Sequence, residues 1–216
     1  MKKIVQLIQS VKGRRQNARP QRKTRAQSLV EFAITLPVLI LLFAGLVEFG
    51  FALNFYLSLM DATREAARFA SNWDPFLRDA DNNPSGDRMG FYDDTITRAL
   101  LNLDPWVGDP TYQGRRIILD PAKDDILVTV FAWSDAGGVI RYPASGTVTL
   151  YHVRTSRFTD ADIASRFEPG SPNAGLVLVE VHYNYHQNLA IPFLTEFVPD
   201  PIFMRAYTIM PLSSIQ

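Results

Sequence analysis

The chain of 216 residues contains no cysteine and only three histidines. No disulfide can therefore stabilise an exported domain, which must rely on its own packing or on neighbouring subunits. Motifs that carry enzyme chemistry are also missing, because the sequence has no Gly-x-Ser-x-Gly elbow, no His-Glu-x-x-His and no glycine-rich phosphate loop. We expect no enzyme, no cofactor and no small-molecule substrate; the alternative is a site assembled from distant serine or carboxylate residues.

Two patterns suggest a metal site, but each lacks the residues or the spacing that such a site needs. Residues 79–90 have acidic and amide side chains at alternating positions, but Pro84 stands where a calcium loop needs glycine and Gly90 where it needs glutamate. His182 and His186 lie four residues apart in an alternating run, which separates them by about 13 Å along a strand. We expect both histidines to be exposed and predict no metal.

The first 26 residues have no acidic side chain, and this absence predicts the topology. They carry nine basic residues, which should keep the N-terminus in the cytoplasm. Removing these nine from the 22 basic residues of the chain leaves 13 against 22 acidic ones, so the remainder has a net charge of −9. A nucleic-acid-binding leader is the alternative, but the basic run adjoins an apolar segment and lacks interleaved aromatic residues, so we expect no nucleic-acid partner.

A long apolar segment follows the leader. Sixteen uncharged residues, 32–47, separate Glu31 from Glu48, and the segment continues with apolar residues to Leu53. The 17 steps between the two carboxylates span about 26 Å of helix, close to the roughly 30 Å of a hydrocarbon core. We predict one transmembrane helix over 27–53 that begins near Ser28. Pro37 removes one backbone donor and favours a kink in it.

The order of signals around Ala26 differs from that of an ordinary secretory signal, whose small cleavage-site residue follows the apolar core. Here Ala26 precedes the core and directly follows the basic cluster. This order resembles the class III leader of prepilins, in which a prepilin peptidase cuts on the cytoplasmic side and the apolar helix is kept. The resemblance implies cleavage between Ala26 and Gln27, which would make Glu31 the fifth mature residue, where pilins carry a glutamate.

The run from Gln27 to Gly50, followed by Asp-Ala-Thr-Arg-Glu-Ala-Ala-Arg-Phe-Ala at 61–70, resembles the TadE-like family. These proteins are pseudopilin-like components of tight-adherence (Flp) pilus systems. The resemblance covers about residues 26–70, and the chain departs from it in one place, since the family usually has glycine where this chain has Ala26. It implies a location in the bacterial cytoplasmic (inner) membrane, with an extracellular pilus as the alternative location. The partners that it implies are a prepilin peptidase, other pilin or pseudopilin subunits and the pilus assembly machinery.

Glu31 is the strongest candidate for a functional side chain. A carboxylate about a turn inside an apolar helix costs free energy in the membrane unless it is paired or solvated. In pilin-like proteins the resemblance implies a partner, the free amine of the mature N-terminus, here that of Gln27 in the same or a neighbouring subunit. The alternative is an interfacial glutamate solvated by headgroups and by the basic residues 22–25. Glu48 lies near the outer boundary, where solvation is cheap, so we expect it to matter less.

Beyond the membrane, residues 54–72 keep helical periodicity, and residues 73–216 form the exported domain. We expect a surface loop over 74–88, a short helix over 91–103 and then a change to period two. The fold class is α+β: a long N-terminal helix projecting into an antiparallel sheet, with the lollipop proportions of pilins. Strands are predicted at 126–133, 139–142, 147–153, 176–185 and 202–209, with an edge strand at 117–119, a hairpin turn at 136–138, a helical turn within 157–167 and a connection at 168–173.

Two functions fit these features. The first is a pseudopilin-like structural or assembly subunit of a tight-adherence pilus or a related secretion machine. The second is a single-pass, membrane-anchored extracytoplasmic binding domain unrelated to pili. A major Flp pilin resembles little more than the helix itself, whereas this chain continues for over a hundred residues, so the first interpretation favours a minor component.

Overall fold

The computed structural model describes residues 22–81, 84–134, 137–167, 175–189 and 198–212. The chain divides into two compact units, Met1–Val47 and Glu48–Gln216. Residues 1–21 of the predicted leader, Ala136 of the predicted hairpin turn and the predicted connection at 168–173 lie outside the described residues. Of residues 22–26 only the helical backbone is described.

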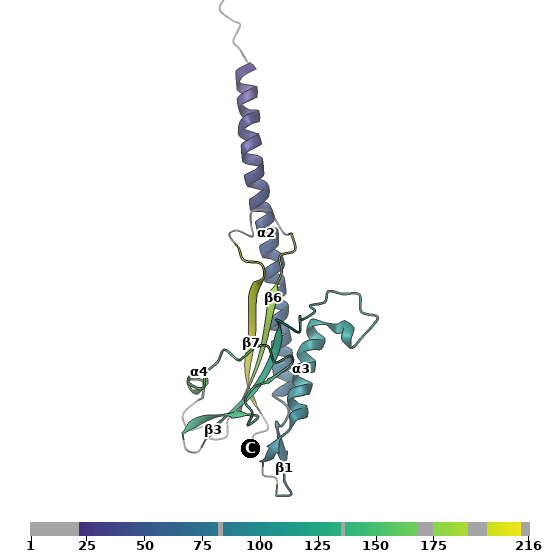
Figure 1. The fold of residues 1–216 in the computed structure, drawn as a ribbon, viewed down its shortest axis with the longest axis vertical. Coiled ribbons are helices and arrows are strands. Elements are labelled where there is room, and N and C mark those ends of the chain that lie inside the picture. The colour runs from purple at the N-terminus through teal and green to yellow at the C-terminus, as the bar shows by residue number, and fades with distance from the viewer. Residues whose placement is uncertain (1–21, 82–83, 135–136, 168–174, 190–197, 213–216) are drawn as a thin grey trace, which may run out of the picture. The chain divides into compact units, whose positions relative to one another are not determined.

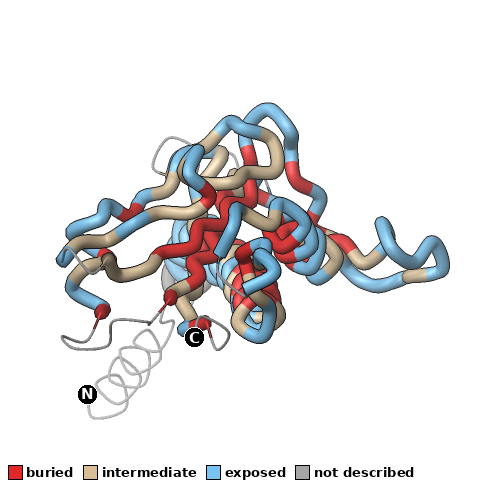
Figure 2. The backbone as a smooth tube through the Cα atoms, turned by 90° about the horizontal axis from the view of Figure 1, so that it is seen from below, coloured by how far each residue is buried: buried red, intermediate tan, exposed pale blue. Residues whose placement is uncertain are grey.

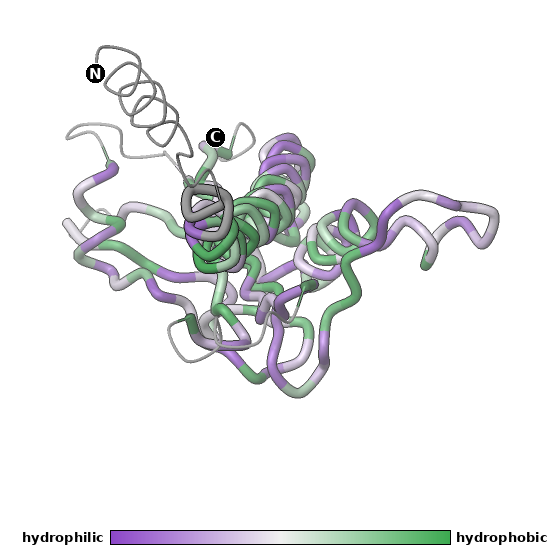
Figure 3. Tube along the Cα trace, turned by 90° about the horizontal axis from the view of Figure 1, so that it is seen from above, coloured by the Kyte–Doolittle hydropathy of each residue, from purple (hydrophilic) through white to green (hydrophobic). Residues whose placement is uncertain are grey.

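The first long element is helix α2, Arg22–Ala70, which contains Pro37 and passes through both units. The transmembrane prediction is supported, because Gln27–Ala70 is long and apolar enough to cross a membrane and its most apolar window is unburied within the described part of the chain. Figure 3 shows green, hydrophobic residues over much of this helix. The helix begins six residues before the predicted start at Ser28, since arginine, lysine and alanine all favour helix.

The second unit is built on an antiparallel sheet, which confirms the α+β class (Figure 1). Its two central strands are β3, Asp125–Ser134, and β6, Gly175–Tyr185, paired antiparallel from Asp125↔His182 to Ala132↔Gly175. The strand order is β4-β3-β6-β7, with β4 at Gly138–Tyr142 and β7 at Ile202–Leu212, and the short β5, Val148–Thr149, also pairs with β3. These strands match five of the six predicted ones.

One face of the sheet packs against helices. The part of α2 in the second unit buries one stripe of small and apolar side chains, and helix α3, Met89–Leu103, adds a second apolar face. Small residues let the helix backbone approach the sheet closely, and Thr63 Oγ1 lies 2.9 Å from Thr208 Oγ1 of β7. Figure 2 shows the buried segments, in red, gathered where the sheet and helices meet. The fully buried residues of α2 are Leu59, Ala62, Thr63, Ala66, Ala67 and Ala70.

The opposite face of the sheet is also covered, and this corrects the prediction for His182. A second cluster packs there around Phe131 of β3 and Phe158, next to the short helix α4, Asp160–Ala164. His182 on this face is only 1% exposed, with its Nε2 3.6 Å from Glu180 Oε1 and its ring centroid 5.7 Å from that of Phe203. The alternating pattern identified the two faces correctly, but the error was to treat the second as open to water. His186, beyond the strand, is exposed as predicted.

Two local predictions were wrong, and a third was right over only part of its length. The segment 74–88, predicted as a loop, contains an antiparallel ribbon of β1, Phe76–Arg78, and β2, Pro84–Asp87. The predicted edge strand at 117–119 is irregular chain, although Ile117 is buried in the core and its N–H bonds to Leu103 O. The predicted strand at 147–153 pairs only as β5, because the Asp125 carboxylate accepts the backbone N–H groups of residues 151, 153 and 154 and draws them off the ladder.

One short helix and one ion pair lie in the connection between α3 and the sheet. The 3-10 helix η1, Pro105–Val107, follows α3, and Asp104 between them is 4% exposed. Its carboxylate accepts two hydrogen bonds from the Arg116 guanidinium, the second at 2.8 Å. This bidentate pair holds the pKa of Asp104 below its ordinary value. The pair fixes the connection between α3 and β3, so that Ile117 and Leu119 reach the core.

Candidate functional site

The predicted processing site lies in the first turns of α2. Ala26 and Gln27 are both helical, and Gln27 is exposed. The Gln27 side chain points along the helix, because its Nε2 donates a hydrogen bond to Glu31 Oε1 at 3.1 Å. Cleavage between Ala26 and Gln27 stays a prediction.

Glu31 is an exposed carboxylate in an apolar stretch of α2. Its neighbours Val30 and Phe32 are about 60% exposed, so the surrounding helix surface is hydrophobic. The carboxylate faces the N-terminal side of the helix, toward Gln27. The Thr35 hydroxyl donates a hydrogen bond to the backbone carbonyl of Glu31 at 2.7 Å. The helical spacing of four residues therefore brings Glu31 to the residue that would become the mature N-terminus.

Pro37 follows Glu31 in the helix by about 1.7 turns. The helix assignment is continuous through it, from Arg22 to Ala70. The proline removes one backbone donor, and the carbonyl of Ala33 loses its helical partner as a result. A kink at Pro37 stays a prediction.

Glu48 is buried, so the expectation that it is solvated at the outer membrane boundary was wrong. The residue is only 6% exposed, and its carboxylate is surrounded by donors from the end of β6 and the chain that follows. The Tyr185 hydroxyl and the backbone N–H of Asn188, at 2.9 Å, both donate to Oε1. The backbone N–H of Leu189 donates to Oε2 at 2.8 Å. Glu48 therefore fastens the exit of β6 to the first turn of α2 in the second unit.

Tyr185 shares the burial of this network. The residue is 1% exposed, and Asn188 Nδ2 donates to its hydroxyl at 3.1 Å while that hydroxyl donates to Glu48. Burial, followed by the hydrogen bond to the carboxylate, raises the pKa of Tyr185 to about 12. The hydroxyl thus stays protonated, and able to donate, throughout the physiological pH range. The ring edge packs on Phe55 of α2 at 5.1 Å between centroids.

Sequence reasoning missed Glu48 even though a signal was present. Counting back along α2 from the buried Ala62 and Leu59, the stripe passes through Phe55 and Ala52 and reaches Glu48 at helical spacing. A glutamate on the core-facing stripe needs donors from the packed domain. The prediction for Glu48 used its position near a membrane boundary and did not use this stripe.

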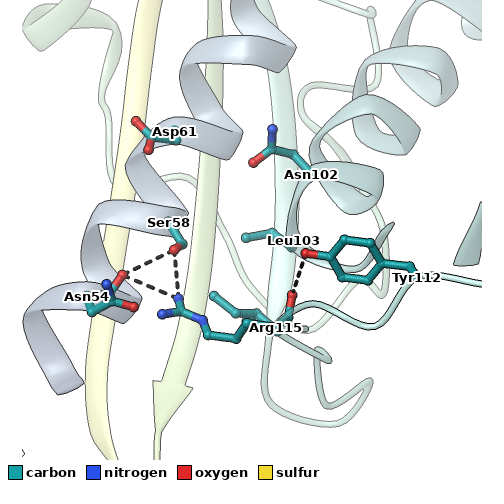
Figure 4. Close-up of a pocket in the computed structure, with 8 residues that line it drawn as sticks. Asn54, Ser58, Asp61, Asn102, Leu103, Tyr112 and Arg115 are labelled. Atoms are coloured by element: carbon teal, nitrogen blue, oxygen red, sulfur yellow. Dashed lines mark hydrogen bonds between the residues drawn. The ribbon is translucent and has the colours of Figure 1, made fainter. Parts of the chain in front are cut away.

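A polar hollow of about 470 Å³ lies beside α2 on another side of the second unit (Figure 4). Arg115 dominates it: its Nη2 donates to Ser58 Oγ at 2.7 Å and to the Asn54 carbonyl at 3.3 Å, and its guanidinium stacks 4.4 Å from the Phe55 ring. The Tyr112 hydroxyl bonds to the Arg115 carbonyl at 3.3 Å. These contacts tie the irregular chain before β3 to α2. The hollow is lined by Asn54, Ser58, Asp61, Asn102, Leu103, Tyr112, Arg115 and Ile117, and none of the predicted site residues is among them.

These features define a helix-anchored α+β protein, and one apolar helix among the described residues indicates a membrane pass. Residues 26–68 match the family model described as TadE-like protein, so the resemblance is confirmed over that segment. The match implies involvement in tight-adherence (Flp) pilus systems, with the membrane and pilus components as partners, and the family is structural rather than catalytic. No curated protein and no solved structure matches the chain.

Proposed function

We propose that this chain is a minor pseudopilin-like subunit of a tight-adherence pilus or a related secretion machine, cut by a prepilin peptidase before Gln27. The observation that carries the proposal is the TadE-like match over residues 26–68, which includes the cleavage position, Glu31 and the whole apolar segment. The orientation follows from the basic leader, which keeps the N-terminus in the cytoplasm. The sheet domain then lies on the outer side of the bacterial inner membrane.

The size of the second unit supports a minor role. It contains a five-stranded sheet, two packed helical faces and a second hydrophobic cluster, all of which are absent from a subunit that is little more than a helix. A large folded domain beside every helix limits how closely identical helices can pack. The chain is therefore suited to a few copies that prime, cap or assist assembly.

Glu31 supplies the pairing chemistry of this proposal. The carboxylate lies on an exposed apolar surface, where an unpaired charge is costly in lipid. Within one chain its neighbour is the neutral Gln27 amide. Cleavage would add a charged α-amine at Gln27, and an amine from an adjacent subunit would pair more strongly with the carboxylate than an amide does.

Processing tests the proposal against the alternative of a simple anchored domain. In a host that supplies its prepilin peptidase, we expect the membrane-extracted protein to begin at Gln27, as measured by intact mass and N-terminal sequencing. Ala26→Gly should preserve or increase cutting, because it restores the usual family residue, and Ala26→Arg should block it.

Ala33→Gly serves as the matched control, since it makes the same substitution inside the helix and away from the cleavage position. A chain that retains Met1 in the wild type and in Ala26→Gly, or one cut after Phe49, would contradict the processing proposal.

A further inference from the structure

The chain that follows β6 lies against α2 at the level of Glu48. We infer that the outer edge of the hydrocarbon core falls at Val47, so that Glu48 and the adjoining residues 186–189 lie in the headgroup layer and contact phospholipid headgroups. The inference rests on the proposed membrane-spanning role of α2. It shortens the predicted span of 27–53 at its outer end.

Backbone chemistry is the first argument. Residues 186–189 are irregular, and His186, Asn188 and Leu189 are exposed. Lipid-exposed irregular backbone does not occur within a hydrocarbon core, because its polar groups find no partners there. The N–H groups of Asn188 and Leu189 bind the Glu48 carboxylate directly, so these residues and Glu48 are at the same level along α2. The level of Glu48 must then lie outside the hydrocarbon.

Length is the second argument. The 20 residues 28–47 span about 30 Å of helix, which equals the thickness of a typical hydrocarbon core. A span of 27–53 would reach about 40 Å and would need a tilt of about 40° to fit, at the limit of the observed range. Such a tilt would also draw the irregular residues at Glu48 into lipid.

The side chains at this level suit an interface. Phe49 and Leu189 expose 65% and 43% of their surface, next to the exposed amide of Asn188 and the polar Glu48 network. Apolar groups can enter the acyl boundary there while the amides bind headgroups or water. A headgroup layer is about 5–8 Å deep on each side of the membrane, and Leu57 lies about 14 Å beyond Glu48 along the helix. Leu57 should therefore face the aqueous side.

The native chain has no cysteine, so single cysteines can report depth without background. We would introduce them into the full chain at Leu42, Leu46, Phe49, Leu53 and Leu57, all of which are at least 45% exposed on α2, and at Leu189. Each variant would carry a nitroxide and be placed in liposomes of phosphatidylethanolamine and phosphatidylglycerol. Collision rates with oxygen, which enters lipid, and with a water-soluble nickel chelate would then be compared.

We expect oxygen collisions to dominate at Leu42 and Leu46 and nickel collisions to dominate at Leu53 and Leu57, with near-equal rates at Phe49 and Leu189. Dominant oxygen collisions at Leu53 or Leu189 would overturn the inferred boundary while leaving a membrane span in place. Dominant nickel collisions at Leu46, with oxygen still dominant at Leu42, would also overturn it. Nickel dominance at every position, including Leu42, would overturn the membrane-spanning part of the proposed function as well.

Discussion

Glu48→Ala is expected to lower the free energy of unfolding of the second unit by about 2–3 kcal/mol. The substitution leaves three donors without their acceptor: the Tyr185 hydroxyl and the N–H groups of Asn188 and Leu189. Each buried unsatisfied group costs about 1–3 kcal/mol, and the total falls toward the lower end because Asn188 and Leu189 are exposed and water can replace the acceptor there. Tyr185→Phe, which removes only one donor, should cost about 1 kcal/mol.

Urea unfolding of the full chain in detergent provides the measurement. The three tryptophans, Trp73, Trp106 and Trp133, all lie in the second unit, so their fluorescence follows that unit alone. Glu65→Ala is the matched control: it removes a glutamate from the same helix, but one whose partner Arg68 is exposed. That control should change stability by less than about 0.5 kcal/mol. An equally small effect for Glu48→Ala would mean that the carboxylate does not hold the exit of β6.

Glu31→Gln should abolish association with other pilus subunits without impairing insertion or cleavage. The substitution keeps the shape of the side chain and removes the charge that would pair with an N-terminal amine. We expect crosslinking to partner subunits to fall at least tenfold at equal membrane abundance, a change of about 1.4 kcal/mol or more.

The choice of control for this variant follows from the structure. Glu48→Gln is unsuitable, because Glu48 holds the domain together through three hydrogen bonds. Glu65→Gln makes the same chemical change on the same helix, at a position paired with the exposed Arg68. If Glu31→Gln retained wild-type crosslinking, Glu31 would be an interfacial residue solvated by headgroups.

The long-range architecture was largely predictable because its elements follow strong periodic patterns. Ile126, Val128 and Val130 of β3 alternate with residues of the other face, and the same period runs through β6. The core stripe of α2 at Leu59, Ala62 and Ala66 was likewise evident from its spacing. Such patterns determine which residues face a core, and the sheet and helix follow from them.

The remaining errors have a common physical cause. Where the sequence periodicity is weak, contacts between residues far apart in the sequence decide the local structure and the burial. The backbone N–H groups of residues 151, 153 and 154 bind Asp125 and thereby shorten β5, and His182 is buried beside Glu180 and Phe203. Glu48 belongs to the same class, since its partners lie more than 130 residues away in the sequence. No local pattern indicates which distant N–H groups will meet a given carboxylate.

Pilus assembly in a strain that lacks this chain tests the central claim most directly. Surface pili would be counted by electron microscopy and measured in the sheared extracellular fraction, in the wild type, the deletion strain and the complemented strain. A structural or assembly subunit predicts that deletion removes or strongly reduces pili, and that the wild-type chain restores them while the cleavage-blocked Ala26→Arg chain does not. Normal piliation in the deletion strain would contradict the proposed function and favour an anchored binding domain unrelated to pili.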